Sequence, residues 1–107
     1  MIKNFKPSEV QSFAELVSYQ EGQVVSKTLA QDDHHSLTLF AFEKGEEIST
    51  HASSGDALVI ALDGVGLVTI DGTEYQLEKG QSILMPSNLP HAIYAPERFK
   101  MFLVVIF

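Results

Sequence analysis

The dipeptide Asp71-Gly72 constrains the fold more than any other feature of this chain. It lies between two short segments of strand-forming residues, 66–70 and 73–77. A two-residue Asp-Gly loop between such segments is the strongest short-range signal of a β-hairpin, because both loop positions need a positive φ. The sequence therefore predicts an antiparallel strand pair in the second half of the chain.

Further strand-like segments lie on both sides of this hairpin. The pattern predicts strands near 24–29 and over 36–42, 47–53, 57–62, 83–85, 91–94 and 99–107. Segment 36–42 presents alternate residues to two faces, and 57–62 is apolar throughout, as in a buried strand. Lys44-Gly45, Asp63-Gly64 and Lys79-Gly80 end segments. Short strands separated by glycine turns predict an all-β sandwich or barrel rather than a parallel α/β sheet.

The N-terminal part departs from this pattern. Apolar residues there recur at helix-like spacing after Pro7-Ser8, and Gly22 follows as a stop: Val10, Phe13, Ala14, Leu16 and Val17. We expect one short N-terminal helix. No linker or repeat interrupts the 107 residues, so we expect a single domain over 1–107.

Composition argues against several classes of partner and location. Fourteen acidic and seven basic residues give a net charge of −7, and the basic ones are scattered. We therefore expect no nucleic-acid or membrane partner. There is no cysteine for a disulfide or a thiolate metal site. The N-terminus lacks the apolar run of a secretion signal, and the longest such run, Met101 to Phe107, is too short to span a bilayer. We expect a cytoplasmic protein.

Two stretches follow fixed spacings of glycine, histidine and proline. The pattern G-x5-H-x-H-x3-E-x6-G is matched in spacing by Gly45, His51, Ser53, Ala57 and Gly64. The pattern G-x5-P-x-G-x2-H-x3-N is matched by Gly80, Pro86 and His91, with Asn88 for its second glycine and Ala95 for its asparagine. These are the two cupin motifs, at 45–64 and 80–95, and the chain resembles a small single-domain member of the cupin superfamily. The resemblance implies a cupin-type double-stranded β-helix, or jelly-roll barrel.

The resemblance also implies a metal site that this chain has partly lost. In the family pattern, both motif-1 histidines, the glutamate and the motif-2 histidine form a four-ligand centre. Residues at i and i+2 of a strand share a face, so an H-x-H pair would aim both imidazoles into the barrel. Here Ser53 replaces the second histidine and Ala57 the glutamate. His51 and His91 remain, and catalytic zinc sites normally keep three protein ligands.

Two interpretations of these residues stay open. In the first, His51, Ser53 and His91 are polar residues of a pocket that binds a small molecule, and no cofactor is required. In the second, His51 and His91 hold a divalent transition metal (Ni, Zn, Cu, Fe or Mn), since imidazole suits these ions. The first predicts a small-molecule-binding barrel with a degenerate metal site. The second predicts a metal-dependent cupin enzyme of the dioxygenase or isomerase type, so enzymatic activity is left open.

Other polar candidates carry weaker signals. Asp32-Asp33-His34-His35 is interpreted as a solvated turn, because adjacent histidines on an extended chain face opposite ways. Tyr75 and Tyr94 could donate protons beside a histidine, but a tyrosine in a strand usually packs its ring and places its hydroxyl at an edge.

A homodimer is the expected assembly. Small cupins generally pair, and this resemblance is one reason. The other is the surplus of apolar residues at both ends of the chain, around 13–17 and over 102–107, which a small barrel would not bury completely. An open sheet edge there would also invite strand addition.

Overall fold

The computed structural model describes all residues, 1–107, and is built almost entirely of strands. The strands are β1 (Val24–Gln31), β2 (His35–Phe42), β3 (Glu47–His51), β4 (Asp56–Ile70), β5 (Thr73–Glu78), β6 (Ser82–Met85), β7 (His91–Tyr94) and β8 (Phe99–Ile106). The predicted all-β class is therefore confirmed. The structure contains no helix that is long and apolar enough to cross a membrane.

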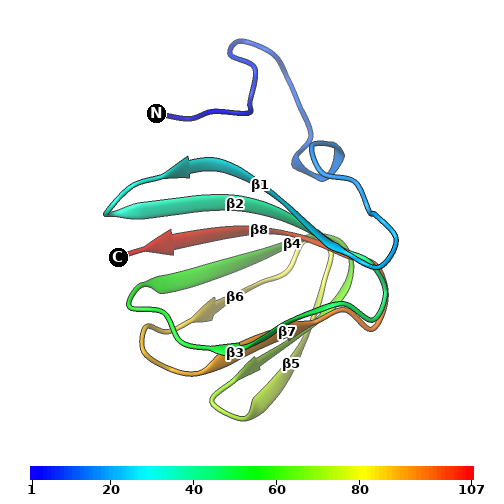
Figure 1. Cartoon of the computed structure of the whole chain (residues 1–107), viewed down its shortest axis with the longest axis vertical. Helices are drawn as coiled ribbons and strands as arrows, with labels where there is room; N and C mark the ends of the chain where they lie inside the picture. Colours follow the sequence, from blue (N-terminus) through cyan, green and yellow to red (C-terminus); the bar gives the residue numbers. More distant parts are fainter.

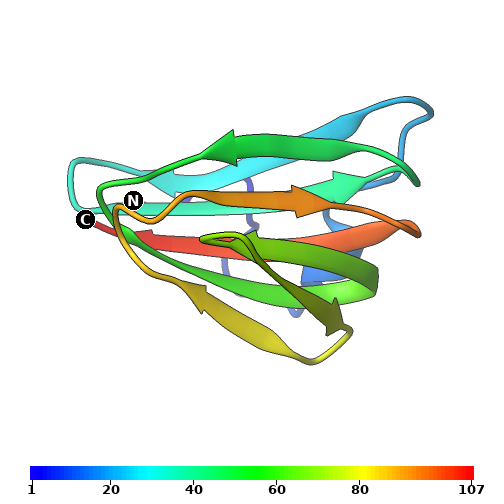
Figure 2. The same cartoon turned by 90° about the horizontal axis from the view of Figure 1, so that it is seen from below.

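The strands form two layers that share β4. The order of hydrogen-bonded neighbours is β1-β2-β8-β4-β7-β3, and β5 and β6 also pair with β4. Figure 1 shows β1, β2 and β8 in the upper layer, β3, β7 and β5 in the lower one, and β4 bending between them. Seen from below, β3 and β7 lie side by side across the barrel (Figure 2). This is the jelly-roll barrel that the sequence predicts.

The long strand β4 corrects one sequence prediction. Asp63-Gly64 separates two predicted strands, 57–62 and 66–70, yet the structure has one strand of 15 residues. The register against β8 shifts between Ala61 and Asp63, and β4 passes there from one sheet to the other. Gly64 has φ of 73°, and a Cβ on it would lie 1.6 Å from the Arg98 carbonyl oxygen. Glycine thus bends this strand and does not end it.

The N-terminal segment corrects a second prediction. The expected helix is reduced to a single 3-10 turn, η1 (Phe13–Glu15). Asn4 and Ser8 have positive φ, which interrupts regular structure before it. The apolar residues pack instead on the outer face of the upper sheet, where Val17 is buried and the Phe13 ring stacks on Phe102 at 4.6 Å. Tertiary packing has overridden the helical periodicity.

The central hairpin and the main core follow the sequence closely. Asp71 and Gly72 have φ of 48° and 83°, as a two-residue turn of this type needs. Between the sheets, the core contains large side chains with no exposed surface, among them Phe42, Val59, Phe99 and Met101. This core fills one end of the barrel and leaves the other end open for a cavity.

Candidate functional site

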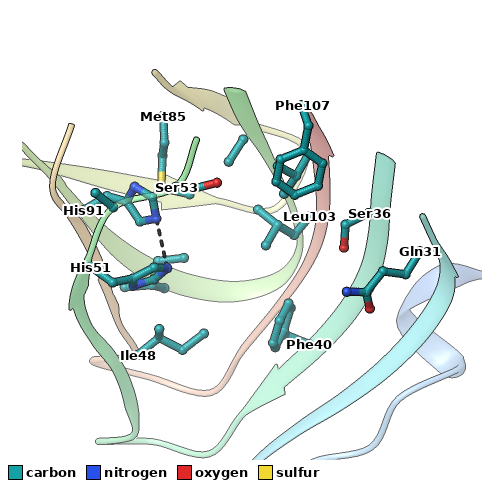
Figure 3. A pocket seen from close by; sticks show the side chains of 14 residues that line it. Gln31, Ser36, Phe40, Ile48, His51, Ser53, Met85, His91, Leu103 and Phe107 are labelled. Carbon is teal, nitrogen blue, oxygen red and sulfur yellow. Dashed lines mark hydrogen bonds between the residues drawn. The ribbon is translucent and has the colours of Figure 1, made fainter. Parts of the chain in front are cut away.

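A cavity of about 440 Å³ lies between the two sheets. Its apolar wall comes from both layers and includes Phe40, Ile48, Met85, Leu103, Val105 and Phe107. Its polar groups are Gln31, Ser36, His51, Ser53 and His91 (Figure 3). A mostly apolar cavity with a few polar groups is the usual form of a small-molecule site.

The four ligand positions of the two motifs all reach this cavity. His51 is the last residue of β3 and Ser53 lies in the loop after it, while Ala57 is near the start of β4. His91 begins β7 and is the cross-strand partner of His51. The motif frame thus places positions that are distant in the chain around one interior space.

Backbone geometry at the motif turns agrees with this frame. Gly45 and Gly80 both have φ of 87°, a conformation that glycine adopts without steric cost. Asn88, which stands where the motif has a glycine, has φ of 64°. Asparagine is one of the few other residues that tolerates the left-handed region, so this departure from the motif preserves the turn.

The two histidine rings meet inside the cavity. Their Nε2 atoms are 3.1 Å apart, and the ring centroids are 4.3 Å apart with the planes at 74° (Figure 3). His91 is buried, with 4% of its surface exposed, whereas His51 is exposed at the rim. The pair therefore has one ring in the wall and one ring facing the opening.

A backbone carbonyl sets the protonation of the pair. Nδ1 of His51 lies 3.0 Å from the Ser49 carbonyl oxygen, which can only accept, so this nitrogen carries the hydrogen. Nε2 of neutral His51 then has a free lone pair, and Nε2–H of His91 donates to it. Nδ1 of His91 is left buried without a hydrogen-bond partner. The two Nε2 atoms thus satisfy each other, with His91 as the donor and His51 as the acceptor.

Burial, followed by the charge that His51 can carry, lowers the pKa of His91 below its ordinary value of 6.5. The Leu89 backbone opposes this shift, although it does not reach hydrogen-bond geometry with Nδ1. His91 is consequently neutral near pH 7.

Sequence reasoning missed the opposite wall of the cavity. Gln31 is the last residue of β1, and its register partner Ser36 is the second residue of β2. Phe107 lines the same part of the cavity. One signal was available: Ser36 shares the face of β2 with Phe40, four residues later, at the period of a strand. Nothing local indicated Gln31 or Phe107.

The weaker candidates lie away from the cavity. His34 and His35 are exposed in the β1–β2 turn, where the Asp32 carboxylate accepts from both backbone N–H groups at 2.7 and 2.8 Å. Tyr75 and Tyr94 are 43% and 41% exposed and do not line the cavity. Both the turn and the two tyrosines thus follow the simpler structural interpretation.

The two histidines of the cavity can be compared with the ligands that a metal ion needs. Two ligands of one zinc ion, with bonds of about 2.0–2.1 Å, lie roughly 3.4 Å apart in tetrahedral geometry. The Nε2 separation of 3.1 Å is near that value. However, no group of three or more His, Asp or Glu side chains is placed to hold a metal ion. Asp56, the acidic residue nearest in sequence to Ala57, is exposed and accepts from the Ser87 backbone N–H. Two imidazoles alone do not fit a resident catalytic metal.

Comparison with known proteins agrees with the geometry. The family model described as "Cupin domain" matches residues 38–107. A conserved protein of unknown function from Streptococcus pyogenes is 41% identical, with a TM-score of 0.96 over 98% of this chain and 92% of its own. A cupin superfamily protein from Desulfitobacterium hafniense is 32% identical, with a TM-score of 0.96 over 100% of this chain and 98% of its own.

A third solved structure is larger. A cupin 2 conserved barrel domain protein from Leptotrichia buccalis is 43% identical over 88% of this chain, which covers 46% of that protein, with a TM-score of 0.86. A search of curated proteins gave no significant match. With its family match and these relatives, the chain belongs to the cupin superfamily as a small conserved-barrel protein.

Proposed function

We propose that this protein binds a small organic molecule in its interior cavity, with His51 and His91 orienting the ligand. One observation carries the proposal: the four motif positions surround a cavity of about 440 Å³ that retains two histidines and no Asp, Glu, Lys or Arg side chain. Ser53 and Ala57 add space where the motif has metal ligands. The walls that remain are suited to an apolar body and a hydrogen-bonding head.

The histidine pair supports an orienting role. A ligand hydroxyl that inserts between the rings replaces the His91–His51 hydrogen bond, because it can donate to Nε2 of His51 and accept from Nε2–H of His91.

The test uses 4-hydroxybiphenyl as the probe, followed by amide NMR shifts and calorimetry. We expect saturable binding with shifts at His51, His91 and Leu103, which all line the cavity. Ala57→Leu should abolish binding, because Ala57 lines the cavity and is 2% exposed. The matched control is Leu58→Gln, which changes the outward-facing next residue, 36% exposed, on the same strand.

Two results would overturn the proposal. One is no saturable shift at any cavity residue in the wild type. The other is equal binding to Ala57→Leu and the wild type when the variant's amide spectrum shows an intact barrel. An unfolded Ala57→Leu would be replaced by Ala57→Val, which adds less volume at the same place.

A second candidate is weak binding of a transition metal by His51 and His91, favoured by the 3.1 Å separation of their Nε2 atoms. This site would bind nickel, copper or zinc more tightly than magnesium or calcium, since imidazole is a nitrogen donor. Metal content after purification without a histidine tag tests it. A metal-dependent enzyme would additionally need ligands from water or substrate. Absence of bound metal, and of binding at millimolar nickel, would remove this candidate.

We also propose a homodimer, now on residues that overlap only in part with those that first suggested it. Phe13 and Phe102, from the two apolar ends of the chain, cover each other with stacked rings. Exposed apolar side chains remain on the outer face of the upper sheet, namely Leu58, Leu84 and Ile106. Leu58 and Leu84 are cross-strand partners, so they form a continuous patch.

Light scattering at high micromolar concentration tests the dimer. Leu84→Glu should yield a monomer, because a charge would be buried in the contact. Tyr94→Glu, on the other sheet and away from Leu84, is the control and should leave the dimer intact. A wild-type monomer would refute the dimer proposal.

A further inference from the structure

The polar groups of the cavity lie on two opposing sides. His51 and His91 form one side, and Gln31 and Ser36 form the other, with Phe40 and other apolar side chains between them (Figure 3). The Gln31 side-chain amide is directed toward the cavity in this view. A ligand that fills the space therefore meets hydrogen-bonding groups at both of its ends.

The second polar side is held in place by the turn next to it. Gln31 and Ser36 are register partners on β1 and β2, immediately before and after the turn 32–35. The Asp32 backbone N–H donates to the His35 carbonyl at 2.9 Å, and the Asp32 carboxylate accepts from two further backbone N–H groups. These bonds close the hairpin and hold the backbone from which the Gln31 and Ser36 side chains extend.

The lining also defines the charge of the ligand. The chain has fourteen acidic and seven basic residues, yet no Asp, Glu, Lys or Arg lines the cavity. A buried ligand charge would have no charged side chain as its partner at neutral pH, and an unpaired buried charge is expensive.

Both polar sides can donate and accept. At the first side the acceptor is Nε2 of His51 and the donor is Nε2–H of His91. At the second side the Gln31 amide and the Ser36 hydroxyl each provide both functions. A hydroxyl or amide group, which also donates and accepts, matches either end.

We propose that the ligand is an uncharged molecule with an apolar body and a hydroxyl or amide group at each end. The first group binds between His51 and His91, and the second binds Gln31 and Ser36. The inference rests on the proposed binding function and adds the chemical class of its ligand.

The experiment compares two probes that differ by one hydroxyl. 4-Hydroxybiphenyl can use only one polar side, whereas 4,4′-dihydroxybiphenyl can use both. The shorter pair, phenol and 1,4-dihydroxybenzene, serves as a length control that is too short to reach both sides. Calorimetry should show that the second hydroxyl of the longer probe tightens binding about three- to tenfold, the effect of one net hydrogen bond.

The gain should depend on the second polar side. In Gln31→Leu/Ser36→Ala the ratio of the affinities of the two longer probes should fall to about one. Thr69→Val is the matched control, because it removes a hydroxyl from β4 on the face opposite to the buried Val68, at a position that does not line the cavity. It should retain the full gain.

Each other outcome overturns the inference in an identifiable way. No gain in the wild type, or a gain that persists in the double variant, refutes the role of Gln31 and Ser36 while leaving the binding function standing. Tighter binding of biphenyl-4-carboxylate than of 4-hydroxybiphenyl refutes the uncharged class. Failure of 4-hydroxybiphenyl itself to bind overturns the binding function, and this inference with it.

Discussion

The chain contains two pairs of histidines, and they contrast in almost every respect. His34 and His35 are neighbours in sequence, lie in an exposed turn, and have ring centroids 6.1 Å apart. His51 and His91 are separated by 40 positions, yet their Nε2 atoms are 3.1 Å apart inside a cavity. The pair that is close in sequence interacts with its own turn, and the distant pair forms the candidate site.

The difference follows from how strands place side chains. Adjacent residues of a strand face opposite ways, whereas cross-strand partners face the same way at about 5 Å between Cβ atoms. The turn histidines act locally: the His35 ring and the His34 and His35 backbones bond to the Asp32 carboxylate. Proximity in sequence is therefore a poor guide to a histidine site in a barrel.

The largest effect is expected when ligands are restored to the inner pair. Ser53→His/Ala57→Glu adds two donors at positions that line the cavity with His51 and His91. Loss of outer-shell partners alone costs metal sites about 10–100-fold in affinity, so two added ligands should tighten nickel or zinc binding by at least about 100-fold. Titration calorimetry measures this.

The matched control for that variant is Ser54→His/Leu58→Glu, which places the same groups on the exposed neighbouring residues. It should bind no tighter than the wild type. A folded Ser53→His/Ala57→Glu variant with wild-type affinity would contradict the site geometry.

Removing one ring from each pair should separate their contributions to stability. His91 is 4% exposed, so His91→Ala leaves a cavity and should lower the free energy of unfolding by about 2 kcal/mol. His35 is exposed, and His35→Ala should change the free energy of unfolding by less than about 0.5 kcal/mol. Urea denaturation of both variants checks this. Equal losses would show that burial does not distinguish the pairs.

The pH dependence of stability should come from the inner pair. Burial lowers the pKa of His91 below 6.5 in the folded chain. As the pH falls below that value, the unfolded chain therefore binds more protons at this residue than the folded chain does. The contribution of neutral His91 to the free energy of unfolding is thus complete above pH 6.5. It is lost as the pH drops toward the lower pKa of the folded state. Urea midpoints of metal-free protein at pH 7.5 and 5.5 measure it.

His91→Gln should flatten this profile between pH 7.5 and 5.5, and His35→Gln should leave it as in the wild type. If His91→Gln retains the wild-type slope, another group is responsible for the dependence.

The smallest expected effect concerns the outer pair and its carboxylate. Bonds from the His34 and His35 backbones, and then from the His35 ring, lower the pKa of Asp32 from 3.8 to about 2. His35→Ala removes only the last of these, so the Asp32 pKa should rise but stay below 3.8. NMR titration of the carboxyl group measures it. A return to 3.8 would mean that the ring, and not the backbone, holds the turn.

Much of the fold was predictable because its signals are local. Asp71-Gly72 predicts its turn from residue type alone, and the strand at 91–94 matches β7 (His91–Tyr94). The errors arose where long-range contacts override a local rule. Gly64 looks like a strand end, but its contact with the Arg98 backbone makes it a bend within β4. The apolar spacing before Gly22 suggests a helix, but Phe13 stacks on Phe102 of β8.

The sequence by itself determined the family and most of the strand pattern, because motif spacing and strand period are properties of the chain. It also determined that two of the four family ligands are lost, at Ser53 and Ala57. Only the tertiary structure decided that Ser49 orients the histidine pair and that Gln31 and Ser36 form a second polar side. Those contacts join separate strands, and their geometry depends on register and packing that no single segment encodes.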